Sequence, residues 1–190
     1  MHWTISNILT LLRVALIPVI VALYLGGASG YLTAGVFLLA GLTDWADGFL
    51  ARQRNEESPF GAFLDPVADK LMVSAVLVLM AADPQMREHV FSPGLFTVIV
   101  AIIIGREITI SALREWMAEL GRRGVVAVRW IGKVKTTLQF VAITVLLFAQ
   151  AGMHKETLIL GELLLFVAGA LTLWSMVIYL RGAWPSLSQQ

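Results

Sequence analysis

Long apolar stretches alternate with short polar links along the whole chain, and each stretch is about as long as a membrane span. An α-helix needs about 20 consecutive apolar residues to cross a hydrocarbon core of about 30 Å. The pattern therefore predicts an all-α integral membrane protein with six transmembrane helices. The predicted helices cover residues 6–25, 31–54, 59–81, 94–120, 130–149 and 157–181.

The links between these stretches carry turn and cap signals. Glycines at 26, 27 and 30 predict a tight turn, residues 82–93 a loop, and Ser58 followed by Pro59 the start of the third helix. Pro18 and Pro66 fall inside predicted helices, where each removes a backbone hydrogen bond and favours a bend. No boundary between domains is visible, so residues 1–190 are predicted to form one membrane-embedded domain.

The basic residues predict the orientation of the helices. An even number of spans puts both termini on one side, and twelve of the fourteen lysines and arginines fall on that side. The opposite side has only Arg87 and Lys155. Because cytoplasmic loops are enriched in these residues, both termini are predicted to be cytoplasmic. The first stretch lacks a preceding basic residue and is interpreted as a retained helix, not a cleaved signal.

Composition excludes some classes of function. The chain is 58% hydrophobic and 14% charged, with a formal net charge of +1, and its bases form no single stripe. These features argue against a nucleic-acid partner. The chain has no cysteine, so it forms no disulfide and its redox compartment cannot be inferred.

Four of the five aspartates cluster between Asp44 and Asp69, in sequence that otherwise predicts buried helix. Asp44 and Asp47 are three residues apart, and Asp65 and Asp69 are four apart, so each pair lies on one face of its helix. A carboxylate at membrane depth costs about 2.5–3.5 kcal/mol on insertion scales, and mutual repulsion adds to that cost. The cluster therefore predicts a bound cation.

Hard oxygen ligands favour Mg²⁺ or Mn²⁺ over zinc or copper, which prefer cysteine or histidine. Two metal ions held by four carboxylates are a common arrangement for displacement at phosphorus. The alternative is a set of structural ion pairs with Arg52 and Lys70, but two bases cannot neutralise four acids.

Basic residues on the same predicted side offer a site for a substrate phosphate. They are Arg52, Arg106, Arg114, Lys133 and Lys135. Arg106 and Arg114 share one side of their predicted helix with Glu107 and Ser111. Lys133 and Lys135 point about 200° apart, so one of them is expected to face away. Glycines and alanines at 48, 51 and 61 leave room near the aspartates or allow close helix packing.

The aspartates also belong to a longer pattern. From Asp44 to Asp69 the chain contains Asp-x2-Asp-Gly-x2-Ala-Arg-x8-Gly-x3-Asp-x3-Asp. This pattern resembles the complete signature of the CDP-alcohol phosphatidyltransferases. The start Asn7-x2-Thr10-x2-Arg13 and the six-helix plan agree with that family, and residues 106–121 and 130–137 resemble its bacterial phosphatidylglycerophosphate synthases.

The resemblance implies transfer of a phosphatidyl group from CDP-diacylglycerol to glycerol 3-phosphate, with release of CMP. It implies a homodimer in the bacterial inner membrane, with the active site facing the cytoplasm. Two Mg²⁺ or Mn²⁺ ions would bind Asp44, Asp47, Asp65 and Asp69, and Asp69 would also be the general base. CDP-diacylglycerol would contact Asn7, Thr10, Gly48, Ala51, Arg52 and Gly61, and the acceptor phosphate would contact Arg106, Arg114, Lys133 and Lys135.

Two alternatives remain at this stage. A cardiolipin synthase of the same fold would use phosphatidylglycerol as the acceptor, but the bases expected on residues 106–135 favour a small dianionic acceptor, which needs several basic groups around one point. A divalent-cation transporter would place its ion site near the bilayer midplane, on broken helices related by an internal repeat. Here the aspartates lie toward one surface, and no repeat is visible.

Overall fold

The computed structural model describes residues 5–54, 59–121, 130–152 and 154–187, with all of their side chains except those of 5–7, 44–54, 59–63, 131, 186 and 187. Every regular element in these ranges is a helix, which confirms the predicted all-α class. The helices are α1 (Ile5–Leu25), α2 (Gly30–Arg54), α3 (Pro59–Ala82), α4 (Pro84–His89), α5 (Pro93–Glu119), α6 (Trp130–Gln150) and α7 (Lys155–Leu187).

Two elements differ from the predictions. The predicted loop at 82–93 contains the short helix α4, which Asp83 caps by accepting a hydrogen bond from Gln85 N at 2.8 Å. Pro84 takes the first helical position, where its missing N–H costs nothing. The last helix continues past residue 181 to Leu187 and contains Pro185. The predicted turn after α1 is confirmed, since Gly27 has a φ of 68°, a conformation that favours glycine.

The apolar helices are long enough to cross a membrane. Among the described residues, four stretches qualify by length and hydropathy: Ile8–Leu25, Pro93–Glu119, Gly132–Gln150 and Lys155–Pro185. A shorter apolar stretch, Gly30–Thr43, forms the first part of α2. The rest of α2 and the start of α3 carry the acidic motif, so these two helices contain charged residues beside their apolar ones. The six-span count therefore remains a prediction.

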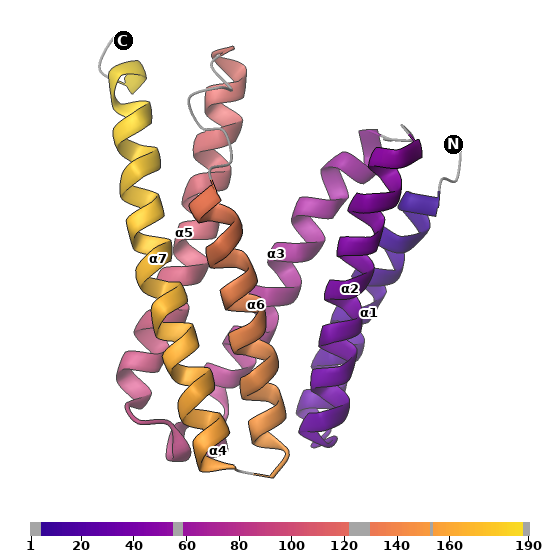
Figure 1. Ribbon diagram of the computed structural model, residues 1–190, viewed down its shortest axis with the longest axis vertical. Coiled ribbons are helices and arrows are strands. Elements are labelled where there is room, and N and C mark those ends of the chain that lie inside the picture. Colours follow the sequence, from indigo (N-terminus) through magenta and orange to yellow (C-terminus); the bar gives the residue numbers. More distant parts are fainter. Residues whose placement is uncertain (1–4, 55–58, 122–129, 153, 188–190) are drawn as a thin grey trace.

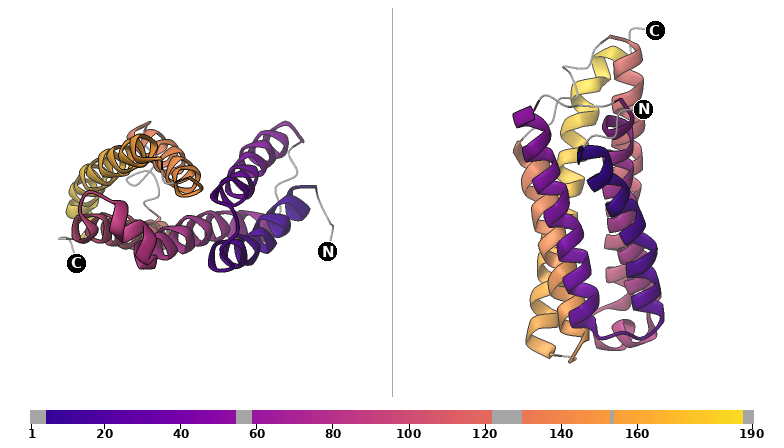
Figure 2. Two further views of the ribbon diagram at one scale, coloured as in Figure 1. Left: turned by 90° about the horizontal axis from the view of Figure 1, so that it is seen from below. Right: turned by 90° about the vertical axis from the view of Figure 1, so that its right-hand side faces the viewer.

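The long helices run roughly along one axis and form two groups (Figure 1), which are joined by α3 and by the packing of α2 on α6. Helices α1 and α2 pack on each other, and α5 and α6 both pack on α7. Helix α3 lies between the groups and contacts both α1 and α5, as the view from below shows (Figure 2). The described chain begins in α1 and ends in α7 at the same end of the molecule (Figure 1).

The two groups pack tightly in the half that contains α4. Phe37, Met80, Ile103, Leu146 and Leu165 come from five different helices, and all are fully buried there. Close packing drives helix association in lipid, and small residues make it possible. Gly30 is one such residue: a Cβ atom at this position would lie 2.5 Å from the carbonyl oxygen of Leu147.

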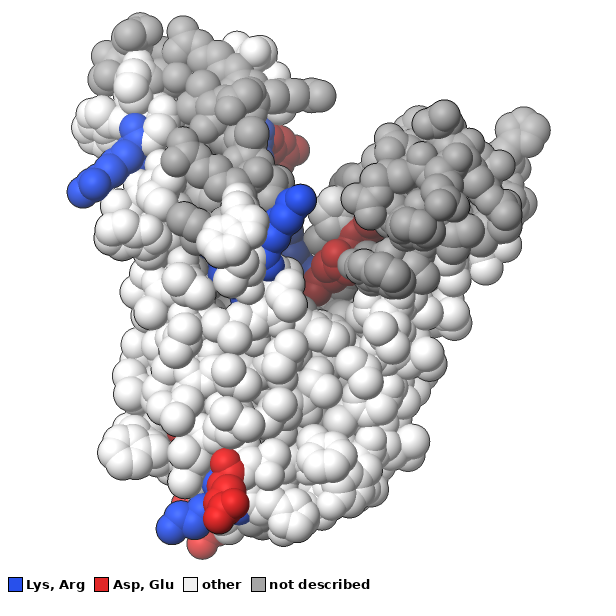
Figure 3. All heavy atoms as spheres, in the orientation of Figure 1, with Lys and Arg blue, Asp and Glu red and all other residues white. Residues whose placement is uncertain are grey.

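At the other end the two groups diverge. A separate apolar cluster, which includes Ile110, Met117 and Tyr179, joins α5 to α7 there. Between the groups lies a hollow with acidic side chains on one wall and basic side chains on the facing wall (Figure 3). The fold therefore brings the two kinds of charge singled out in the sequence to one opening.

Candidate functional site

Asp65 and Asp69 of α3 make the acidic side of the candidate site, and α1 holds both of them. The carboxylate of Asp65 accepts a hydrogen bond from the hydroxyl of Thr10. Asp69 Oδ1 accepts one from Arg13 Nη1 at 3.1 Å. Thr10 and Arg13 are three residues apart, so they share the face of α1 that packs on α3.

The Arg13–Asp69 pair explains an arginine for which the sequence suggested no function. The side chain of Arg13 is 0% exposed, whereas that of Asp69 is 43% exposed and opens toward solvent. A buried guanidinium in an apolar helix is costly unless it is paired, and the aspartate supplies the partner. Arg13 in turn fixes one oxygen of Asp69 and leaves the carboxylate accessible to a ligand.

The other half of the acidic motif lies on the last turns of α2. The backbone there is helical through Arg54, so Asp44 and Asp47 lie one turn apart, as their spacing predicts. The side chains of Asp44, Asp47, Asn7, Ala51 and Arg52 lie outside the described residues, and the surroundings of Gly48 and Gly61 are likewise not described. Among the described side chains, no three histidine, cysteine, aspartate or glutamate residues form a metal-binding group.

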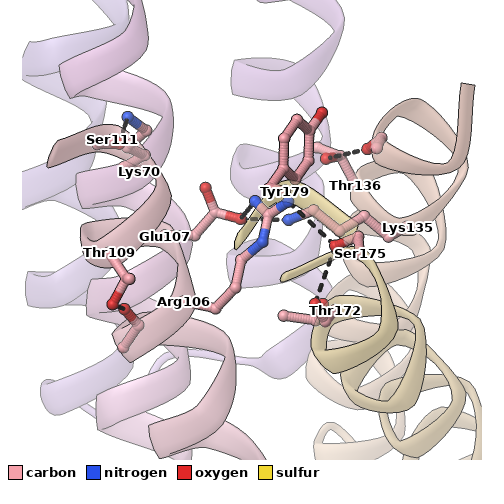
Figure 4. Close-up of polar contacts among 12 residues, drawn as sticks. Lys70, Arg106, Glu107, Thr109, Ser111, Lys135, Thr136, Thr172, Ser175 and Tyr179 are labelled. Carbon is pink, nitrogen blue, oxygen red and sulfur yellow. Dashed lines mark hydrogen bonds and ion pairs between the residues drawn. The ribbon is translucent and has the colours of Figure 1, made fainter. Parts of the chain in front are cut away.

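Arg106, Glu107 and Lys135 make the basic side of the site (Figure 4). Glu107 accepts a hydrogen bond from Arg106 Nη1 at 3.1 Å, and the same oxygen accepts one from Lys135. The side chains of Arg106 and Lys135 are 5% and 3% exposed, and that of Glu107 is 23% exposed. This cluster places two buried cations against one acid, so it carries a net positive charge.

The structure separates the two lysines that begin α6. Lys133 is exposed, whereas Lys135 is buried and bonded to Glu107. This agrees with the prediction from helix geometry that one of them faces away. Lys70 extends from α3 to α5, where it donates a hydrogen bond to Ser111, and so links the acidic helix to the basic one (Figure 4).

Helix α7 completes the basic side with residues that sequence analysis did not single out. Arg106 Nη2 donates to Ser175 Oγ at 3.0 Å, and Arg114 Nη2 donates to Tyr179 Oη at 3.2 Å. Serine and tyrosine are common in membrane helices, and nothing in their spacing indicates a site. The only available signal was that Ser175 and Tyr179 are four residues apart and therefore share a face.

A cavity of about 610 Å³ lies at the opposite end of the molecule, beside the turn between α1 and α2. Its polar groups bond mainly to one another: Asp83 Oδ2 accepts from Tyr24 Oη at 2.8 Å and from Gln150 Nε2 at 2.5 Å. This network joins α1 and α6 to the link between α3 and α4, and Asp83 also caps α4. We interpret it as structural, because it is remote from the charged hollow and its carboxylate is already satisfied.

Comparison with known proteins gives consistent matches along the whole chain. A family model described as CDP-alcohol phosphatidyltransferase matches residues 3–177. The CDP-diacylglycerol–glycerol-3-phosphate 3-phosphatidyltransferase of Salmonella typhimurium is 50% identical over 192 residues, which cover 100% of both chains. The protein of that name from Pseudomonas fluorescens is 49% identical over 187 residues, 96% of this chain and 91% of the relative.

Proposed function

Because this chain belongs to the CDP-alcohol phosphatidyltransferase family, we propose that the charged hollow is the active site of a phospholipid-synthesising transferase. The enzyme transfers the phosphatidyl group of CDP-diacylglycerol to glycerol 3-phosphate and releases CMP, the reaction named for its full-length relatives. One observation supports the assignment of particular residues. An acidic wall on α3 faces a basic wall on α5 and α6 across the hollow.

The acidic wall suits a divalent cation. Asp65 and Asp69 offer hard oxygen donors one helical turn apart, and the carboxylate of Asp69 is partly open. We assign Asp44, Asp47, Asp65 and Asp69 as the residues that would hold two Mg²⁺ or Mn²⁺ ions. When bound, such ions offset the negative charge of the diphosphate and of the departing CMP.

Asp69 is also the proposed general base. The primary hydroxyl of glycerol 3-phosphate attacks the lipid-bearing phosphorus, the bond from that phosphorus to the CMP oxygen breaks, and the hydroxyl proton passes to the Asp69 carboxylate. Arg13 supports this function because its hydrogen bond to Oδ1 orients the carboxylate. Thr10 orients the neighbouring Asp65 in the same way.

Arg106, Arg114 and Lys135 are the proposed ligands of the acceptor phosphate. Arg106 and Lys135 contribute buried positive charge and Arg114 partly buried positive charge, which suits a small dianion. Guanidinium groups bind phosphate oxygens through paired N–H donors. Lys133 is a weaker candidate than Lys135, because its side chain is exposed whereas that of Lys135 is buried against Glu107. This choice narrows the four acceptor-site residues expected from sequence to three.

The donor is proposed to bind on the α1–α2 side of the hollow. Asn7, Thr10, Gly48, Ala51, Arg52 and Gly61 are assigned to CDP-diacylglycerol. The lipid would enter from the bilayer and the acceptor from the cytoplasm. We place this end of the helices at the cytoplasmic face of the inner membrane because the basic residues concentrate there. A homodimer is proposed from the family resemblance alone.

Acceptor choice is the direct test of this function. Purified protein is given CDP-diacylglycerol with glycerol 3-phosphate, glycerol, phosphatidylglycerol or serine in turn, and CMP release is measured. CMP release with glycerol 3-phosphate and with none of the other three acceptors supports the proposed function. Release with phosphatidylglycerol instead would make the protein a cardiolipin synthase.

Kinetic constants for each substrate then test the basic wall. Arg106→Ala and Lys135→Ala should raise the KM for glycerol 3-phosphate more than the KM for CDP-diacylglycerol. Lys133→Ala removes a base two residues from Lys135 and serves as the matched control, with little expected effect. Equal changes in both KM values would count against an acceptor-phosphate site on α5 and α6.

A further inference from the structure

Ser175 and Tyr179 are buried polar residues on one face of the long apolar helix α7. Their exposed fractions are 2% and 3%, and both contact arginines of α5. A buried hydroxyl in a membrane helix needs a hydrogen-bond partner, and for serine the backbone of its own helix usually provides one. Contacts with two cations on another helix therefore require a further explanation.

Ser175 presents an oriented acceptor to Arg106. Its Oγ donates to the carbonyl oxygen of Thr172 at 2.9 Å, so its proton points back along α7. The lone pairs of the same oxygen then face Arg106 Nη2, which donates at 3.0 Å (Figure 4). The hydroxyl thus fixes the direction of the guanidinium without reducing its charge.

Tyr179 contacts both arginines. The guanidinium carbon of Arg106 lies 5.6 Å from the centre of the tyrosine ring, and that of Arg114 lies 5.4 Å from it. The two arginines are eight residues apart on α5, so their side chains converge on this ring from positions two helical turns apart. The negative face of an aromatic ring attracts a cation and carries no net charge. The ring can therefore hold two mutually repelling guanidiniums near each other and leave their charge available.

The two arginines also have hydrogen-bonding capacity to spare. Within the described part of the chain, the Nε atoms of Arg106 and Arg114 are buried and have no hydrogen-bond partner. Buried N–H groups are nearly always satisfied in folded proteins, so two such donors on neighbouring cations suit an anionic ligand. A phosphate has enough acceptor oxygens to bond both.

We infer that Ser175 and Tyr179 are positioning residues that aim Arg106 and Arg114 at the phosphate of the acceptor. This inference rests on the proposed function of those two arginines. The inference makes α7 part of the acceptor site, although the two residues through which α7 contacts the arginines carry no charge. Glu107 holds Arg106 by a contact that balances part of its positive charge, whereas Ser175 and Tyr179 hold the arginines without adding a negative charge.

Substitution of Ser175 tests the first contact. Ser175→Ala should raise the KM for glycerol 3-phosphate about tenfold, because hydrogen bonds to charged groups are among the stronger ones, and should change the KM for CDP-diacylglycerol less than twofold. Ser175→Thr keeps the hydroxyl and should restore most of the affinity. The matched control is Thr172→Val, which removes a buried α7 hydroxyl that donates to the carbonyl of Ala168, in its own helix.

Substitution of Tyr179 tests the second contact. Tyr179→Phe keeps the ring and removes the acceptor for Arg114, so a smaller rise in the same KM is expected, about threefold to tenfold. Tyr179→Leu removes both interactions and should have the larger effect. Tyr24→Phe removes a phenolic hydroxyl at the other end of the molecule and should leave both KM values unchanged.

The KM comparison separates positioning from folding, because a partly misfolded preparation lowers kcat but not the KM of the molecules that remain active. Combining Ser175→Ala with Arg106→Ala should add nothing to the effect of Arg106→Ala alone. If Arg106→Ala and the corresponding Arg114→Ala both leave the KM for glycerol 3-phosphate unchanged, the proposed acceptor site is wrong. If they raise it but the Ser175 and Tyr179 variants do not, the arginines bind phosphate without help from α7, and this inference alone is overturned.

Discussion

Replacement of Glu107 by glutamine is the perturbation whose outcome the structure defines most clearly. Glu107 is the carboxylate bonded to both Arg106 and Lys135, and these two cations are almost completely buried. Glutamine has the same shape and one remaining carbonyl acceptor, so the substitution removes the charge with little change in volume. The two cations would then repel each other with no acid between them.

The expected loss of stability follows from burial. Breaking a fully buried ion pair costs about 3–5 kcal/mol, and we reduce this to about 2–3 kcal/mol because the Glu107 side chain is 23% exposed and water can reach it. The entropy of unfolding of globular chains of this length relates a loss of stability to a shift in Tm. A loss of this size lowers Tm by at least about 4 °C.

The same change should strengthen phosphate binding, because a dianion would now supply the missing negative charge. A ligand that binds only the folded state stabilises it by about 2.7 kcal/mol when the ligand concentration is a hundred times its Kd. Glycerol 3-phosphate should therefore raise the Tm of Glu107→Gln by more than it raises that of the unmodified protein. Inorganic phosphate should act in the same direction.

The assay is thermal unfolding of detergent-solubilised protein followed by circular dichroism, with and without glycerol 3-phosphate. Glu115→Gln is the matched control, because Glu115 lies on the exposed face of the same helix. An unchanged Tm for Glu107→Gln would show that the cluster does not stabilise the fold. Equal stabilisation of both proteins by glycerol 3-phosphate would show that its phosphate binds elsewhere.

Three further predictions concern the acidic wall and the helix packing. Asp69→Asn should lower kcat by at least about 100-fold and leave CDP-diacylglycerol binding detectable in a filtration assay; near-normal turnover would remove Asp69 from the function of general base. A strong chelator should stop CMP release, and added Mg²⁺ or Mn²⁺ should restore it, whereas activity that survives chelation would disprove metal binding by the aspartates. Gly30→Ala should destabilise the fold by about 1–3 kcal/mol, since the new Cβ would meet the backbone of α6 at Leu147 and Ala151. Gly35→Ala on the same helix meets nothing within 4 Å and should unfold at the same temperature as the unmodified protein or slightly above it.

Sequence alone determined the helices and the composition of the acidic motif. Apolar length and flanking polar residues fix where a membrane helix begins and ends, so the bounds of α1, α2 and α3 agree with the prediction to within about one residue. The spacing of Asp65 and Asp69 predicts that they lie side by side on one face of a helix, because an α-helix has 3.6 residues per turn. The short helix α4 could also have been predicted from sequence, since Asp83 followed by Pro84 is a signal for the start of a helix.

Only the tertiary structure decided which side chains meet across helices. Arg13 and Asp69 are 56 residues apart in sequence, and Arg106 and Ser175 are 69 apart. Such contacts depend on how each helix is rotated against its neighbour, and no local pattern encodes that rotation. The structure therefore paired Asp69 with Arg13, joined Lys70 to Ser111, distinguished Lys135 from Lys133, and brought α7 to the arginines of α5.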